Sequence, residues 1–276
     1  MRLLLVGFAA LLAGTASAAG SGKNGLIAFG ACCGEDVGIY VVKPVGGGLK
    51  RIYKPPFDDA DLTSAWSPNG KRLAYVAPGG VWTMSATGSG RTRLTKGKGG
   101  AGDPTWSADG RQIAFSDLNR AGGRRYDIYV IGSDGNGLKK IIGSPRDDNS
   151  PAWSPNGKQI LFERDGNLWV SSASGRSQRR LRAGGSPAWA PDGKRIAFDY
   201  RGDLWVASAN GTSARRVAVV SSGTAGIAWS PDGSLIAYAS GDRGDVLLVH
   251  PDGTGSRHLT HKGDLFHSWP TWQRAP

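Results

Sequence analysis

Acidic side chains in predicted loops are the first candidates for chemistry in this sequence. Asp61, Asp103, Asp148 and His267 each stand a few residues before a segment that ends in tryptophan. In a ring of repeated sheets, these side chains would lie on one face, at the mouth of the central channel. Oxygen ligands of this kind suit hard cations such as calcium. The sequence therefore predicts a channel-mouth site for a cation or a basic peptide, with solvated loop carboxylates as the alternative.

Catalytic signatures are missing from the sequence. Neither Gly-x-Ser-x-Gly nor His-Glu-x-x-His occurs. His258 and His261 straddle a predicted strand end, but no cysteine or regular ligand spacing completes a zinc site beside them. We therefore expect a protein that is not an enzyme and needs no cofactor. The alternative is a hydrolase or lyase whose site at the channel mouth depends on a cation such as calcium.

The N-terminus has the pattern of a secretory signal peptide. Met1-Arg2 is followed by an apolar run too short to span a bilayer, and then by Ala16-Ser17-Ala18 as a cleavage site. We expect a signal peptide over residues 1–18, with an uncleaved anchor as the alternative, and one folded domain over residues 19–276. No later segment could cross a membrane. The mature chain is expected to be a monomer that is periplasmic, attached to the cell wall or secreted.

The two cysteines, Cys32 and Cys33, are adjacent in the sequence. A bond between them would be strained, because neighbouring Cα atoms are closer than a disulfide prefers. The prediction is two small loop residues, with a vicinal disulfide as the alternative.

Basic residues outnumber acidic ones, with 34 Lys and Arg against 22 Asp and Glu, for a formal net charge of +12. They recur in pairs near the fourth strand of each repeat and are predicted to lie on the face opposite the acidic loops: Arg91, Arg93, Lys139, Lys140, Arg179, Arg180, Arg215 and Arg216. A basic face attracts anionic partners at long range. We expect an acidic protein or an anionic envelope polymer, and not nucleic acid, because no aromatic residues are interleaved for stacking. Solubility and protection of sheet edges is the alternative role.

The predicted loops are organised by a repeated tryptophan. Six tryptophans stand in register at intervals of about 36 to 47 residues: Trp66, Trp106, Trp153, Trp189, Trp229 and Trp272. This interval is close to the period of a four-stranded propeller blade. Most copies continue as Ser-Pro-Asp/Asn-Gly, in which proline and glycine favour the backbone angles of a tight turn. Each tryptophan is expected to pack between neighbouring blades.

Each full repeat contains four short predicted strands. In the repeat of Trp106 these are residues 104–106, 113–115, 128–131 and 139–142. Before Trp66 there is material for only three strands, and after His267 for only one. Joining the two ends would complete a sixth sheet and remove the open edges. The sequence therefore predicts an all-β fold, a single six-bladed β-propeller closed by pairing a C-terminal strand with three N-terminal strands.

The repeated Trp-Ser-Pro-Asp/Asn-Gly-Lys-x-Ile-Ala-Phe, followed by motifs such as Asp127-Ile128-Tyr129-Val130, resembles the TolB-like β-propeller repeat. The resemblance covers essentially all of the expected mature chain. Similar repeats form the propeller of TolB in the Tol-Pal envelope system and non-catalytic propellers attached to prolyl oligopeptidase-type hydrolases. The sequence departs from both, since it shows neither the α/β domain that precedes the TolB propeller nor a hydrolase domain. The resemblance implies an exported, non-enzymatic scaffold that binds a protein or polymer in the cell envelope.

Overall fold

The computed structural model describes residues 22–32, 36–56, 62–96, 100–118, 125–220, 223–241, 244–260 and 266–275, without the side chains of 225, 266 and 267. The predicted signal peptide lies outside the described residues, as does Cys33, so the state of the Cys32–Cys33 pair stays a prediction. None of the described residues forms a helix long and apolar enough to cross a membrane.

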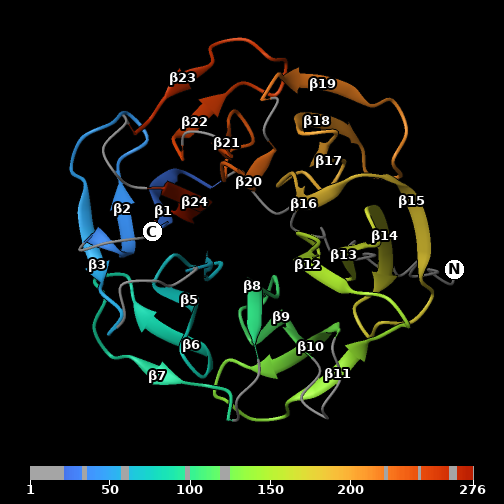
Figure 1. Cartoon of the computed structure of the whole chain (residues 1–276), viewed down its shortest axis with the longest axis horizontal. Coiled ribbons are helices and arrows are strands. Elements are labelled where there is room, and N and C mark those ends of the chain that lie inside the picture. The colour runs from blue at the N-terminus through green and yellow to red at the C-terminus, as the bar shows by residue number, and fades with distance from the viewer. Residues whose placement is uncertain are drawn as a thin grey trace, which may run out of the picture.

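The described residues form six four-stranded antiparallel sheets arranged as the blades of a propeller around a central channel (Figure 1). In each blade the strands follow one another from the channel to the perimeter. Blade 1 consists of β24 (Phe266–Arg274), β1 (Asn24–Cys32), β2 (Gly38–Val42) and β3 (Lys50–Tyr53). Blade 2 consists of β4 (Ser64–Trp66), β5 (Arg72–Ala77), β6 (Gly80–Ser85) and β7 (Thr92–Arg93). Blade 3 consists of β8 (Ala101–Trp106), β9 (Gln112–Leu118), β10 (Tyr126–Gly132) and β11 (Lys139–Ile142). Blade 4 consists of β12 (Asp148–Trp153), β13 (Gln159–Arg164), β14 (Asn167–Ser172) and β15 (Arg179–Ala183). Blade 5 consists of β16 (Gly185–Trp189), β17 (Arg195–Tyr200), β18 (Asp203–Ser208) and β19 (Arg215–Ala218). Blade 6 consists of β20 (Thr224–Trp229), β21 (Ile236–Ser240), β22 (Val246–Val249) and β23 (Arg257–His258). The predicted all-β, six-bladed fold is confirmed.

Blade 1 is assembled from both ends of the chain, as the sequence predicted. Its innermost strand, β24, pairs antiparallel with β1, and the register places Trp272 opposite Ile27. The neighbouring strands β2 and β3 complete the sheet. The ring is therefore closed by hydrogen bonds between strands and not by a covalent link.

The hairpins between the first two strands of the blades are fixed by the Ser-Pro-Asp/Asn-Gly turn. In blade 4, the Oγ of Ser154 accepts a hydrogen bond from the backbone amide of Gln159 at 2.9 Å and donates one to Asn156 at 2.8 Å. The Gly157 backbone has a φ of 70°, in the left-handed region that glycine adopts without steric cost. Ser67, Ser107 and Ser230 make the same bonds in three other blades. Each turn sets the start of the second strand and so the register of its blade.

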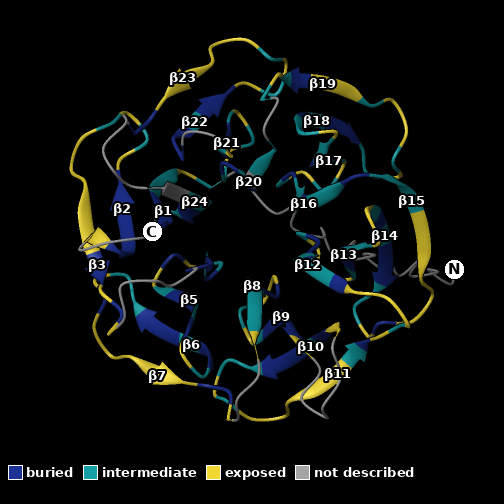
Figure 2. Cartoon of the chain, in the orientation of Figure 1, coloured by how far each residue is buried: buried dark blue, intermediate teal, exposed yellow. Residues whose placement is uncertain are grey.

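The repeated tryptophans lie in the hydrophobic clusters that join neighbouring blades. Trp66, for example, packs with residues of both blade 1 and blade 2, including Ile39 and Leu73. The other five occupy five further clusters of the same kind. The core is thus divided among the blade interfaces. The middle strands of the blades are mostly buried, the innermost strands are largely half-buried, and the outermost strands are the most exposed (Figure 2). The predicted packing of the tryptophans between blades is confirmed.

Candidate functional site

The innermost strands of the blades are distorted at one level of the channel. A β-bulge interrupts the pairing of β8, β12, β16 and β20 with their neighbours. At this level five backbone φ angles are positive: Asp103 (50°), Ser150 (48°), Ser186 (46°), Gly226 (94°) and Trp269 (55°). Non-glycine residues adopt such angles at a cost, and bulges redirect side chains. All five residues stand three positions before a repeated tryptophan, so the repeat itself creates a ring of redirected residues.

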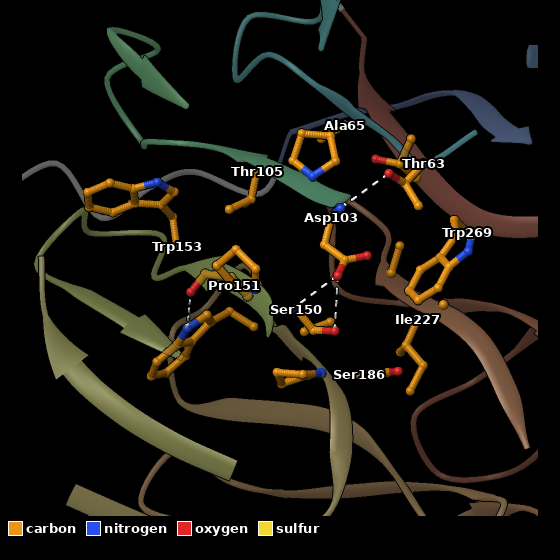
Figure 3. Close-up of a pocket in the computed structure, with 18 of the residues that line it drawn as sticks. Thr63, Ala65, Asp103, Thr105, Ser150, Pro151, Trp153, Ser186, Ile227 and Trp269 are labelled. Atoms are coloured by element: carbon orange, nitrogen blue, oxygen red, sulfur yellow. Dashed lines mark hydrogen bonds between the residues drawn. The ribbon is translucent and has the colours of Figure 1, made fainter. Parts of the chain in front are cut away.

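These residues all line the inner of two adjoining cavities, and four of them also line the outer one. The inner one, the channel cavity, has a volume of about 260 Å³ and is walled by the innermost strands of all six blades. The outer one, the mouth cavity, has a volume of about 410 Å³. Thr63, Asp103, Ser150, Ser186 and Trp269 line both cavities. Figure 3 shows Asp103, Ser150, Ser186 and Trp269 around this opening, where the redirected residues meet.

Carboxylates beside the mouth hold blade 3 to blade 4, blade 4 to blade 5, and blade 5 to blade 6. The Oδ2 of Asp103, in blade 3, accepts hydrogen bonds from the Ser150 amide of blade 4 at 3.3 Å and from the Ser150 hydroxyl at 3.4 Å (Figure 3). Glu163 of blade 4 accepts the amide of Ser186 in blade 5 at 3.1 Å. In the same way, Asp199 of blade 5 accepts a hydrogen bond from the Thr224 amide of blade 6 at 3.0 Å. Each carboxylate thereby fixes the position of the next blade's innermost strand.

Burial and a neighbouring charge shift the pKa of the Glu163 carboxyl. Desolvation raises the pKa of Glu163, the negative charge of Asp199 raises it further, and the hydrogen bond from the Ser186 amide opposes both. A carboxyl with a raised pKa in a cavity is a frequent property of functional sites, although structural networks produce it as well.

The predicted channel-mouth residues have different positions in the structure. Asp103 lines both the channel cavity and the mouth cavity. Asp148 does not line either cavity: it is fully buried at the start of β12, where its Oδ1 lies 2.5 Å from the Nε of Arg164. Burial raises the pKa of Asp148 despite the opposing charge of Arg164. Asp61 and the side chain of His267 lie outside the described residues.

The site also contains residues that the sequence analysis did not select. Glu163, Ser150, Ser186 and Trp269 line the mouth with Asp103. Two sequence signals identify them: Ser150, Ser186 and Trp269 share the position three before a repeated tryptophan, and Glu163 directly follows an apolar-apolar-Phe triplet of the second strand. Asp148 is five positions before its tryptophan, which is a different place in the repeat.

No metal site is evident in the part of the chain that the structure describes. Within these ranges, no group of three or more His, Cys, Asp or Glu side chains is arranged to hold a metal ion. Two of the predicted ligands fall outside these ranges, so a calcium ion at the mouth stays a prediction.

The predicted basic residues lie on or next to the outermost strands β7, β11, β15 and β19, where they form a belt around the perimeter (Figures 1 and 2). Much of this belt is engaged within the protein. Lys140 contacts Asp127 at 3.2 Å, and Arg216 contacts Asp203 at the same distance. Further contacts are those of Arg180 with Asn167, Arg93 with the Gly79 carbonyl, Arg215 with the Pro251 carbonyl, and Arg91 with the Gly88 carbonyl and the Tyr53 ring.

The belt therefore serves partly to tie outer strands to their neighbours. Lys139 and Arg179 are exposed, and their side chains make no hydrogen bond or ion pair with other described residues. The mouth cavity is more confined than the belt and is the stronger candidate site.

Comparisons with known proteins agree with the fold. A family model described as TolB beta propeller domain matches residues 55–185. The chain is 27% identical over 105 residues to the Tol-Pal system protein TolB of Francisella tularensis subsp. mediasiatica (strain FSC147), and equally to that of subsp. tularensis (strain SCHU S4 / Schu 4). The match covers 37% of this chain and only 24% of the relative in both cases. The aligned part is thus about a quarter of the length of these curated relatives.

Solved structures extend the similarity to most of the chain. The crystal structure of TolB from Acinetobacter baumannii superposes with a TM-score of 0.76 at 21% identity, covering 90% of this chain and 66% of that one. A chain of the Nidogen/Laminin complex superposes with a TM-score of 0.74 at 11% identity, covering 90% and 98%. At such identities the likeness shows the fold alone. The chain therefore has the fold of a β-propeller, and its repeats over residues 55–185 are similar to those of the TolB propeller domain.

Proposed function

We propose that this TolB-like β-propeller is an exported, non-enzymatic protein of the cell envelope that binds a protein partner at the mouth of its channel. The observation that carries the proposal is the ring of redirected residues at the mouth. Asp103, Ser150, Ser186 and Trp269 hold positive φ angles around a cavity of about 410 Å³. Backbone strain of this kind is typical of ligand clamps and other functional sites.

The surroundings of the mouth favour a protein over a small metabolite. Tyr126 lines the mouth cavity and is 36% exposed, and the neighbouring Leu118 is 37% exposed. Tyrosine beside a polar rim is characteristic of protein interfaces. An envelope location and a protein partner agree with the Tol-Pal system named for the curated relatives, and the proposed export requires the signal peptide predicted over residues 1–18.

Photo-crosslinking in the living host tests the proposal. The full chain would carry a photoreactive phenylalanine in place of Tyr126 at the mouth, or of Leu138, which lies in the turn between β10 and β11 on the opposite face and is 38% exposed. We expect a discrete crosslinked protein in the envelope fraction from position 126 and none from position 138. The proposal would be overturned by equal crosslinking from both positions, or by a chain that stays in the cytoplasm.

A further inference from the structure

The walls of the channel cavity and the mouth cavity offer hydrogen-bond acceptors. Glu163 uses Oε2 to hold the Ser186 amide, while its Oε1 has no partner among the described residues. The Oδ1 of Asn149, in the wall of the mouth cavity, is buried and also has no partner within the described ranges. In the wall of the channel cavity, Ser64 is 8% exposed and its buried Oγ is likewise unpartnered by any residue that the structure describes.

Buried acceptors without partners are costly. Leaving such a group unsatisfied costs about 1–3 kcal/mol, and more for a charged group. Asn149 Oδ1 and Ser64 Oγ are two such buried atoms, and Glu163 Oε1 adds a charged acceptor in the wall of the mouth cavity. A group that enters the mouth with several hydrogen-bond donors would satisfy acceptors of this kind.

The charges around the mouth cavity indicate the charge of the group that would bind there. The described residues that line the mouth cavity include Asp103 and Glu163 but no Lys, Arg or His. Asp199 lines an adjoining cavity with Glu163 and Arg201, and its negative charge acts on Glu163, whose pKa it helps to raise. This local excess of negative charge occurs on a chain whose formal net charge is +12. The mouth is therefore complementary to a cation.

The apolar walls favour a side chain over a free ion. Trp269 lines both cavities, and below it the channel wall is formed largely by proline, alanine and threonine side chains with Ile227. A metal ion would gain nothing from such a surface. An arginine side chain would gain from this surface, because its methylene stem packs on apolar groups and its planar guanidinium stacks on an aromatic ring. The five N–H groups of the guanidinium also match carboxylate acceptors.

We propose that the channel mouth is an arginine pocket, which takes one arginine side chain of the protein partner and directs its guanidinium to Glu163 and Asp103. This inference rests on the proposed function and specifies what the mouth recognises. Lysine fits less well, since an ammonium has three donors and neither the planar fork nor the stacking surface of a guanidinium. A bound calcium ion is the competing occupant.

A set of short blocked peptides tests the inference. The probes are acetyl-Ala-Arg-Ala-amide, the same peptide with citrulline, which keeps the shape of arginine without its charge, and the same peptide with lysine. Binding to the mature chain would be followed by saturation-transfer NMR at low ionic strength. We expect saturable binding of the arginine peptide, with at least about tenfold weaker binding of both the citrulline and lysine peptides.

Two variants with the same change in charge locate the site. Glu163→Gln keeps an acceptor for the Ser186 amide but removes the charge from the mouth. Asp165→Asn removes a charge only two residues away, from an exposed carboxylate that pairs with Arg146 at 2.7 Å. We expect about tenfold weaker arginine-peptide binding for Glu163→Gln and less than a twofold change for Asp165→Asn, with unaltered thermal unfolding and circular dichroism of Asp165→Asn as a check of its fold.

Several results would overturn the inference. They are equal weakening by both variants, equal affinity for the arginine and citrulline peptides, and binding of calcium chloride alone without any binding of the arginine peptide. A crosslinked partner at position 126 combined with any of these results would leave the proposed function standing and remove only the arginine pocket.

Discussion

Trp272 of β24 lies opposite Ile27 of β1, although these residues are at opposite ends of the described chain. The pair belongs to the cluster that packs blade 6 against blade 1, together with Phe29 and Leu248. The same strand therefore closes the sheet by hydrogen bonding and the ring by side-chain packing.

Deletion of residues 266–276 should destabilise the whole ring. The deletion exposes the edge of β1 and removes Trp272, whose loss alone should cost roughly 3–5 kcal/mol. We expect a single cooperative thermal transition at a much lower Tm, or no folded protein, as followed by circular dichroism. Deletion of residues 275–276 is the matched control: among the described residues it removes only the hydrogen bond from the Ala275 amide to the Lys23 carbonyl at 2.8 Å, and it should lower the Tm far less. A full-length Tm for the longer deletion would contradict the closure described above.

The buried ion pair between Asp148 and Arg164 gives a second prediction. Arg164→Met leaves a fully buried carboxylate without its cation, which typically costs about 3–5 kcal/mol at neutral pH. Because burial already raises the pKa of Asp148, protonation relieves this cost, and the deficit should shrink as the pH is lowered. Urea denaturation at pH 7 and pH 5 measures it.

The double variant Asp148→Asn/Arg164→Met controls for the buried charge. It should recover much of the stability at pH 7, because no charge then remains in the buried site. A deficit of Arg164→Met that is independent of pH, or a double variant no more stable than the single one, would contradict this role of the pair.

The ionised side chain of Glu163 at the mouth should lower the free energy of unfolding at neutral pH. Its pKa is raised in the folded protein, so its favourable contribution is complete below the pKa of the unfolded chain and is lost as the pH rises through the folded pKa. Glu163→Gln should therefore unfold a few degrees above the wild type at pH 7, and the two should converge at acidic pH. Scanning calorimetry over this pH range measures the difference, and a variant that is less stable at pH 7 would refute the assignment.

The strained backbone at Ser186 gives a prediction about the ring of redirected residues. Its φ of 46° costs a non-glycine residue roughly 1–2 kcal/mol, whereas glycine adopts it freely but loses about 0.5–1 kcal/mol of chain entropy on folding. Ser186→Gly should thus gain up to about 1 kcal/mol in urea denaturation, and the β-branched variant Ser186→Val should lose stability. The opposite order of the two variants would show that the backbone at this position carries no strain.

The fold was predictable from the sequence because it depends on repeated local signals. The spacing of the tryptophans and the Ser-Pro-Asp/Asn-Gly turns define each blade, and the unequal ends of the chain define the closure. The strand predicted over residues 139–142 coincides with β11 (Lys139–Ile142). These signals act within one repeat or between adjacent ones, so a single sequence contains them.

The site was predictable only in part because its geometry depends on bulges that the strand pattern does not reveal. The regular alternation of side chains along a strand gave no reason to expect different positions for Asp103 and Asp148. In the structure, the bulge turns the position three before the tryptophan to the mouth, whereas Asp148 pairs with Arg164 on the neighbouring strand β13. The acceptors at Glu163 and Asn149 became visible only once the blades were placed together.

Recognition of a protein at the mouth is tested most directly by the affinity of the crosslinked partner, once purified, for two alanine variants. Tyr126→Ala removes an aromatic side chain from the mouth, and Leu138→Ala removes an equally exposed side chain from the opposite face. Isothermal titration calorimetry should show at least about tenfold weaker binding for Tyr126→Ala, as expected for an aromatic residue in an interface, and no change for Leu138→Ala. Unchanged binding by Tyr126→Ala, or equal weakening by both variants, would contradict the account.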